Sequence, residues 1–358
     1  MAVDISNILE EVNSLCSADK VDINNAIFEE YVRDENFAQH HTVFTEIRNG
    51  QLVPIIDARP DYGFLKVSQG NCETNSCEYN STSTTKKWSP VDYDCRLELC
   101  KQDLECDFRK FWGMRCNDFD NMDDAFMRFL ADKILESHNA SQWRIAYFDD
   151  AESADAEYAG VDGLFKQWLE IVENPANAGQ LFPIPENEGA TIPEQMDLQP
   201  DRAYQLFKAM YNWASMNNTR LLSIPGIHFD VTPELAHNYL GWLMDNKEVN
   251  CCFSATDGVT SSRYSIDNLN YLGIPIVIRH EWSNIIRWAQ EQAGADNLDR
   301  PHRAVLTYTN NKPVGTCDMD AFRDFDMFYE KKDKKIYIDV ATSIDAKVLI
   351  NSDFAIAI

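Results

Sequence analysis

The chain has 358 residues, 44% of them hydrophobic, which suffices for two interwoven domains with a sizeable core. Its formal net charge of −26 excludes attraction to nucleic acid by bulk electrostatics. No apolar run approaches the ~20 residues that cross a bilayer, and residues 1–4 begin no signal-peptide pattern, so we expect a cytoplasmic protein without a membrane partner.

The N-terminal part of the sequence predicts a helical arm. Residues 4–15 place apolar side chains on one stripe at helical spacing, and residues 22–33 can continue as a second helix. Because no strand pattern occurs in this stretch, the chain is expected to open with an extended arm and not with part of a sheet.

Residues 51–110 are β-like on both sides of a polar stretch. Gln51–Ile56 and Gly63–Val67 are apolar and extended, and Tyr93–Leu99 alternates between apolar and polar residues. Asn, Ser and Thr dominate Ser68–Pro90, and a structureless loop of that length is unusual in a compact domain. The pattern predicts a hairpin that projects from the body, with a disordered surface loop as the alternative.

The remaining two thirds of the sequence alternate predicted helices and strands, and Ala178–Pro200 is expected to be a loop. Helices are predicted at 120–138, 161–173, 201–216, 233–245 and from Trp282 to near Gly294. Strands are predicted at 143–148, 221–231, 271–279, 304–309, 325–329, 335–341 and 346–350.

Six of the ten cysteines fall within one segment of the chain: Cys72, Cys77, Cys95, Cys100, Cys106 and Cys116. Their spacing lacks the tight pairs of a zinc ribbon, and the strand alternation points Cys95 and Cys100 to opposite faces. Reduced cysteines that pack as small hydrophobes are the favoured interpretation. Whether these cysteines bind metal or form disulfides stays open.

The sequence carries no motif that assigns an enzyme mechanism. Glycine-rich phosphate loops and a nucleophile elbow are absent. Three weaker patterns have structural interpretations: His280-Glu281 at a strand-to-helix junction, the calcium-like run Asn117–Asn121 as helix-capping residues, and Cys251 or Cys252 near His228 or His237 as buried cysteines. We therefore assign no catalytic, cofactor-binding or metal residue.

The order of the predicted elements is a helical arm, a long β excursion, a long helix, an α/β body and a late β segment. This order resembles the major capsid proteins of tailed bacteriophages, whose fold is shared with encapsulins and herpesvirus capsid floor domains. The local resemblance is carried by Met122–Trp143 as the spine helix, Tyr271–Arg279, His302–Thr309 with Val314–Thr316, and Phe325–Tyr329 with Lys335–Ala341.

The resemblance implies an α+β fold with an N-terminal arm, an extended β-hairpin loop, a spine helix, and peripheral and axial domains. It implies these boundaries: arm 1–49, extended loop 50–112, peripheral domain 113–149 and 301–344, and axial domain 150–300 and 345–358. Some family members cross-link subunits through a lysine of this loop, where Lys86 and Lys87 lie, but no partner asparagine or glutamate aligns here.

The resemblance also implies a function without catalysis. The expected role is a subunit of an icosahedral capsid that self-assembles through hexamers and pentamers in the host cytoplasm and encloses double-stranded DNA without sequence-specific contacts. A separate scaffolding protein, a portal and auxiliary capsid proteins are the implied partners. The alternatives are an encapsulin-like compartment shell and, in a different class, a cytoplasmic cysteine- or zinc-dependent enzyme.

Overall fold

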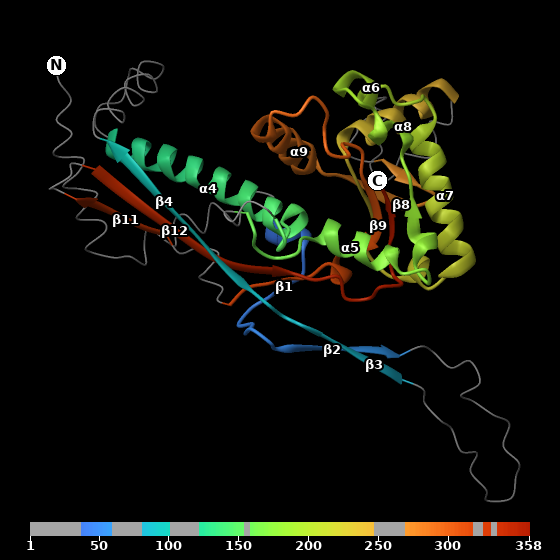
Figure 1. The fold of residues 1–358 in the computed structure, drawn as a ribbon, viewed down its shortest axis with the longest axis horizontal. Helices are drawn as coiled ribbons and strands as arrows, with labels where there is room; N and C mark the ends of the chain where they lie inside the picture. Colours follow the sequence, from blue (N-terminus) through green and yellow to red (C-terminus); the bar gives the residue numbers. More distant parts are fainter. Residues whose placement is uncertain are drawn as a thin grey trace, which may run out of the picture.

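The computed structural model describes residues 37–58, 81–100, 122–153, 158–246, 269–317, 325–330 and 335–358. Several sequence predictions lie outside these residues: the arm helices, the strand at 63–67, the run Asn117–Asn121, and Cys72, Cys77, Cys106, Cys116, Cys251 and Cys252. In the described part, helices and mixed sheets form the expected α+β fold (Figure 1).

A six-stranded sheet forms the centre of the larger body, with strand order β5-β13-β9-β6-β8-β7. All residues of its two central strands are buried, because both strands face one hydrophobic core with alternate side chains, while on the other face β9 meets a second core and β6 carries the buried residues His228 and Asp230. The strands are β5 (Leu181–Phe182), β6 (Ile227–Val231), β7 (Asn270–Tyr271), β8 (Ile274–Ile278), β9 (Ala304–Tyr308) and β13 (Ala355–Ala357).

Helices cover both faces of this sheet. One core packs α7 (Arg202–Asn217) and α8 (Pro233–Asn246) on the first face, and the other packs α5 (Leu164–Glu173), α9 (His280–Ala293) and the end of α4 (Met122–Phe148) on the second. Short elements complete the body: η1 (Phe37–His40), η2 (Ala178–Gln180), η3 (Pro185–Glu188), α6 (Ile192–Met196), η4 (Leu221–Ser223) and η7 (Thr309–Asn311).

A second sheet extends from the body as a long ribbon beside α4 (Figure 1). Its longest strand, β12 (Lys335–Ala346), pairs antiparallel with β4 (Val91–Cys100) over ten residues, from Lys335 opposite Cys100 to Ile344 opposite Val91. On the other side of β12 lie β11 (Phe325–Glu330) and β10 (Val314–Gly315), and β10 in turn pairs with β1 (Val43–Phe44).

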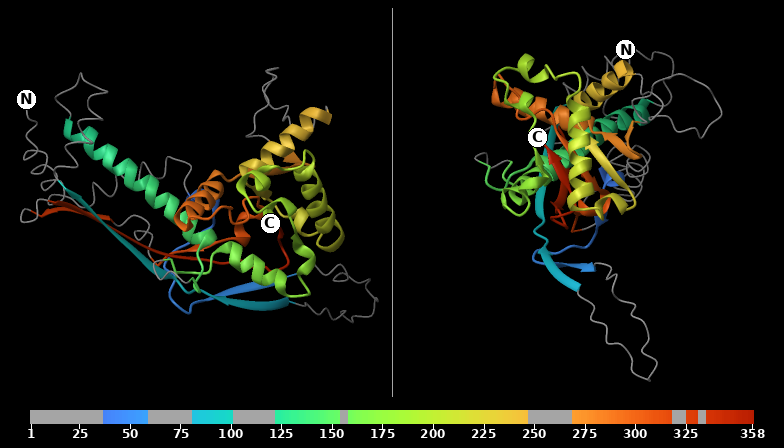
Figure 2. Two further views of the ribbon diagram at one scale, coloured as in Figure 1. Left: turned by 45° about the horizontal axis from the view of Figure 1, so that its top comes forward. Right: turned by 90° about the vertical axis from the view of Figure 1, so that its right-hand side faces the viewer.

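The third sheet is a hairpin of two strands, β2 (Leu52–Ala58) and β3 (Ser81–Lys87). It leaves the body next to β4 and projects away from both larger sheets, as the two views of Figure 2 show. The predicted projecting hairpin is therefore confirmed, but its pairing differs from the prediction. Ser81–Lys87 is a strand and not part of a polar tip, and β4 belongs to the second sheet.

Two predicted strands are wrong. Residues 143–148 are the end of α4, where nearly every side chain is buried; a helix buried all round shows a continuous apolar run instead of a 3.6-residue period. Residues 347–350 are irregular, because the backbone N–H groups of Lys347 and Leu349 bond to the carbonyls of Pro313 and Asn311 in a loop.

Smaller differences concern local turns. The predicted strand at 271–279 is a β7–β8 hairpin with a turn at Leu272-Gly273, and the predicted strand at 221–231 begins with η4. The predicted loop 178–200 contains short helices and β5. The helices at 161–173, 201–216, 233–245 and 282–293 are confirmed, the last with Gly294 as its left-handed cap. Among the described helices, none combines the length and apolarity needed to span a membrane.

Candidate functional site

The base of the β2–β3 hairpin is a packed anchor. Trp88 follows β3 directly and is buried, with its backbone bonded to Gly50 and Gln51 across the base. Gly315 of β10 lies against this indole, since a Cβ built there would sit 2.9 Å from Trp88 Cζ3. Only glycine permits this close approach. The hairpin therefore leaves the body from a fixed position.

A lysine ties the hairpin to the body. Lys86 Nζ donates hydrogen bonds to the backbone carbonyl of Val348 and to Asn351 Oδ1, the latter at 2.8 Å. Partial burial, together with the nearby charge of Lys347, lowers the pKa of Lys86 to about 8. The ammonium is thus used inside the chain, which gives Lys86 a structural role at the hairpin base.

The hairpin forms a sheet of its own. Among the described strands, β2 and β3 pair only with each other, and Leu52 leaves 52% of its surface exposed. A two-stranded hairpin without a third strand or a packed face is marginally stable in water. The hairpin is therefore a surface that gains stability from contact with another molecule.

Strand β4 is a second such surface. It is an edge strand of ten residues, and Val91 and Leu97 are 37% and 39% exposed although they lie on its apolar face. On the opposite face Arg96 forms a two-pronged pair with Asp339 of β12, at 2.5 and 2.7 Å. Both faces of the strand are thus open, unlike those of β6 and β9.

Tyr93 fixes β4 to the corner between α4 and α5. Its hydroxyl donates to Asp149 Oδ2 at 3.1 Å and accepts the N–H of Val161 at 2.9 Å. Burial and the charge of Asp149 raise the pKa of Tyr93, so it stays a neutral donor. Arg144 contacts the same carboxylate through its guanidinium. The ribbon is therefore held rigidly where it leaves the body.

A buried ionic junction joins the two larger sheets. Asp230 of β6 accepts Arg279 Nε at 2.7 Å and contacts Lys312 Nζ, which lies between β9 and β10, and His228 Nε2 is 3.3 Å away. Burial opposes ionisation of Asp230, but the charges of Arg279 and Lys312 outweigh it and hold its pKa well below the usual range.

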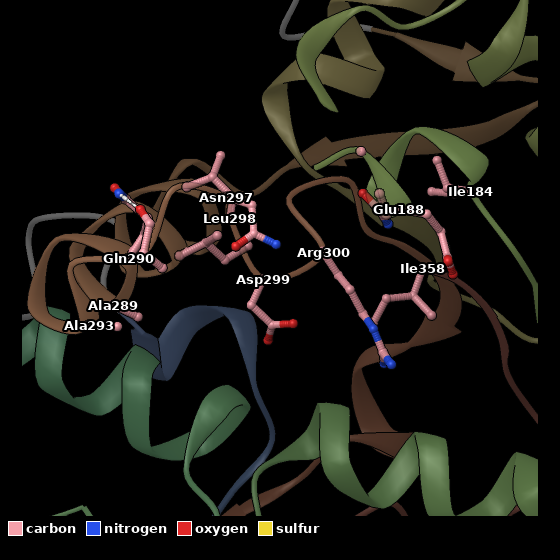
Figure 3. A pocket seen from close by; sticks show the side chains of 14 residues that line it. Ile184, Glu188, Ala289, Gln290, Ala293, Asn297, Leu298, Asp299, Arg300 and Ile358 are labelled. Atoms are coloured by element: carbon pink, nitrogen blue, oxygen red, sulfur yellow. Dashed lines mark hydrogen bonds between the residues drawn. The ribbon is translucent and has the colours of Figure 1, made fainter. Parts of the chain in front are cut away.

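Cavities open on the described part of the body. One, of about 520 Å³, lies between α9 and η3, with Ala289, Gln290 and Ala293 on one side and Ile184 and Glu188 opposite (Figure 3). A second, of about 710 Å³, lies near the end of α7 and is lined by amide side chains and Trp213. The first lining contains no Cys, His, Ser or Lys, so it offers no nucleophile–base pair.

The residues considered from sequence are not brought together into a site. Cys95 is an exposed free thiol on β4, and Cys100 is the last residue of that strand. His237 is exposed on α8, whereas His228 belongs to the ionic junction. His280 and Glu281 open α9 as expected. Within the described ranges, no group of His, Cys, Asp and Glu is arranged to hold a metal ion.

Sequence reasoning missed the ionic junction. Its only local signals are charged residues among apolar ones: Asp230 within Ile227–Val231, and Arg279 directly after β8. Since Lys312 lies 82 residues from Asp230, only the fold shows that they meet.

The backbone was compared with those of solved structures. A chain of the satellite phage P4 procapsid, solved with its size determination (Sid) protein, matches with a TM-score of 0.51 and 10% sequence identity, over 93% of this chain and 98% of that chain. The chain has the tailed-phage major capsid fold. Weaker matches include chains from Mycobacterium phage Ogopogo (TM-score 0.48, 10% identity, 89% and 90% covered) and Gordonia phage Cozz (0.44, 13%, 89% and 84%).

The likeness is one of fold and not of sequence. No family model matches the chain, and no curated protein matches it in sequence. A capsid fold at this level of identity fixes the architecture, while the function has to be argued from the surfaces of this chain.

Proposed function

We propose that this protein is the structural subunit of an icosahedral viral capsid, which self-assembles and encloses double-stranded DNA. The observation that carries the proposal is the β2–β3 hairpin, which is anchored at Trp88 and Lys86, projects from the body (Figure 2) and pairs with no third strand among the described residues. The capsid fold shared with the satellite phage P4 procapsid chain supports it.

Assembly is the proposed mechanism. The hairpin of each copy laps over a neighbour and buries there the surface that its own chain leaves open. Copies form hexamers and pentamers, and the larger body clusters around the symmetry axes. The proposed division of the chain is arm 1–49, extended loop 50–112, peripheral domain 113–149 and 301–344, and axial domain 150–300 and 345–358. The boundary near 345 is supported by β12 and β13, which belong to different sheets.

The proposed partners follow from this role. A scaffolding protein, a portal and auxiliary capsid proteins complete the particle, which forms in the host cytoplasm and is the virion shell. A net charge of −26 suits a wall along which DNA moves without sequence-specific contacts. The role is structural and requires no catalytic residue.

A hairpin-deletion variant tests the proposal. Val53 and Lys86 are paired in the β2–β3 register, so an Asn-Gly turn that joins them removes the projecting part and keeps both anchor residues. Negative-stain microscopy of the full chain, with a scaffold partner where needed, should show closed particles, and the deletion variant should stay unassembled.

Two controls complete the experiment. Circular dichroism and the urea midpoint of the deletion variant should stay close to those of the parent chain, because β2 and β3 pair with no other strand in the described part of the chain. Closed particles from the deletion variant would overturn the proposed mechanism. Nuclease-protected DNA inside particles from the native source distinguishes a capsid from an encapsulin-like compartment, which would hold protein instead.

A further inference from the structure

Residues 37–44 lie across the junction of the two larger sheets and are held there by backbone hydrogen bonds of β1 and by ring contacts of Phe37, His40 and His41 with Trp143 of α4. We call this segment the latch. It consists of η1, His41, Thr42 and the two-residue edge strand β1. Its carbonyls at Thr42 and Phe44 accept the N–H groups of Val314 and Thr316 at 3.0 and 2.8 Å. Because β1 is an edge strand, its departure would leave the rest of the second sheet paired.

His41 sits at the centre of the latch and is buried with both ring nitrogens in use. Nδ1 lies 3.1 Å from the backbone oxygen of Lys312, which can only accept, so Nδ1 carries the hydrogen. Nε2 lies 3.3 Å from the hydroxyl of Tyr147, which donates to it. The neutral ring therefore satisfies both contacts, whereas a second proton on Nε2 would require the Tyr147 hydroxyl to turn and accept that hydrogen.

The surroundings of His41 are already positive. Two cations, Lys312 from the η7 turn and Arg279 from the end of β8, face one carboxylate, Asp230 of β6. Arg279 also stacks 5.4 Å from the ring of Trp143 on α4. The other titratable groups around His41 and these charges are His40 of the latch, His228 of β6, Tyr147 of α4 and Glu281 of α9. Protonation of His41 would add a third positive charge beside Lys312 and Arg279, which share the single carboxylate of Asp230.

We propose that the latch docks only while the His41 imidazole is neutral, and that mild acid releases residues 37–44 while both larger sheets stay folded. The sheets keep their connection, since Asp230, Arg279 and Lys312 all lie outside the latch. Release uncovers Trp143, because Phe37 packs edge-on against it with ring centroids 5.2 Å apart.

The sign and size of the effect follow from proton linkage. Burial, reinforced by Lys312, lowers the pKa of His41 well below 6.5, and burial with Arg279 lowers the pKa of His40 to about 4. Between these values and about 6.5, the released latch binds protons that the docked latch excludes. Each histidine therefore raises the released population about tenfold per pH unit, so both together raise it about a thousandfold at pH 5.

Hydrogen–deuterium exchange of the full chain tests this, with labelling times corrected for the intrinsic rate at each pH. From pH 7.5 to 5, the Val314 and Thr316 amides should lose up to about a thousandfold of protection, while amides of the β6–β9 pair keep theirs. His41→Asn keeps a donor for the Lys312 carbonyl but cannot titrate. The His41→Asn variant should lose only about thirtyfold of protection at the Val314 and Thr316 amides. The double variant with His40→Asn and His41→Asn should lose none of this protection.

His237→Asn is the matched control, since His237 is exposed on α8, and it should respond like the parent chain. An unchanged acid response in His41→Asn, or an equal loss of protection in β6 and β9, would overturn the proposal. Should His41→Asn fail to fold, exchange at the imidazole C2 position of the parent chain decides instead. There His41 should titrate well below pH 6.5 and exchange more slowly than His237, and a midpoint near 6.5 would contradict a latch that excludes the proton.

Discussion

Asp230→Asn removes the carboxylate that two buried cations share. Breaking a buried ion pair by removing one partner costs about 3–5 kcal/mol, because the other charge stays buried without a counter-ion. Asp230 serves both Arg279 and Lys312, and the amide keeps only one oxygen as an acceptor. We therefore expect a loss of about 4–5 kcal/mol, a large part of the total stability of a typical domain.

Urea unfolding of the unassembled chain, followed by circular dichroism, measures this loss. With a slope of ~3 kcal/mol/M, the midpoint should fall by about 1.5 M. Asp339→Asn is the matched control, since that carboxylate also pairs with an arginine but at the exposed surface of β4 and β12. Its midpoint should barely move. Equal shifts in the two variants would refute the claim that burial makes the Asp230 cluster energetically different.

The pH dependence gives this prediction an independent check. Burial lowers the pKa of Lys312 to about 8, although Asp230 opposes the shift. Without Asp230 the lysine should lose its proton at a still lower pH, and a neutral amine is cheaper to bury. The unfolded chain holds that proton up to about 10.4, so the free energy of unfolding rises with pH in this window. The destabilisation by Asp230→Asn should therefore shrink from pH 7 to pH 9.

Three further outcomes are expected. Tyr93→Phe loses both hydrogen bonds of β4 to the α4–α5 corner and should cost about 1–3 kcal/mol in urea unfolding, with faster amide exchange in β4. Gly315→Val forces a side chain against Trp88 and should cost about 1–3 kcal/mol, whereas Gly241→Ala, at an open helical position, should cost nothing measurable. Light scattering should show assembly strengthened between about 0.05 and 0.5 M NaCl, because salt screens repulsion between subunits of charge −26; weaker assembly at high salt would contradict this.

The sequence predicts helices well where one stripe of the helix is buried. In α5, the buried residues are Leu164, Phe165, Trp168 and Val172. Because they stand at helical spacing, the 3.6-residue period of the helix can be recognised in the sequence. The end of α4 defeats the same reasoning, because its residues contact η1, α5 and α9 on several sides and nearly all are apolar. Periodicity carries no information where an element has no solvent-facing side.

The pairing of strands was less predictable than their existence. The predicted strand 335–341 stops five residues before the end of β12, and the alternation of β4 gave no indication that its partner lies 235 to 253 residues away in the chain. The ionic junction is hidden for the same reason, since Asp230, Arg279 and Lys312 come from three separate segments. Local patterns report the burial of a residue, but the identity of a distant partner depends on the topology.

Strands of this chain differ in how far their own chain covers them. Strands β6 and β9 are covered on both faces by helices of the same chain, and even their charged residues find partners there, so this body has the means to fold alone. Strand β4 pairs with β12 and is fixed to the body by Tyr93, and the β2–β3 hairpin is fixed by Lys86 and Trp88, but Val91, Leu97 and Leu52 of these strands stay exposed. A projection that is fixed in direction but uncovered costs less entropy when a neighbour covers it. Rigid anchoring next to missing cover is thus the arrangement that assembly with other copies requires.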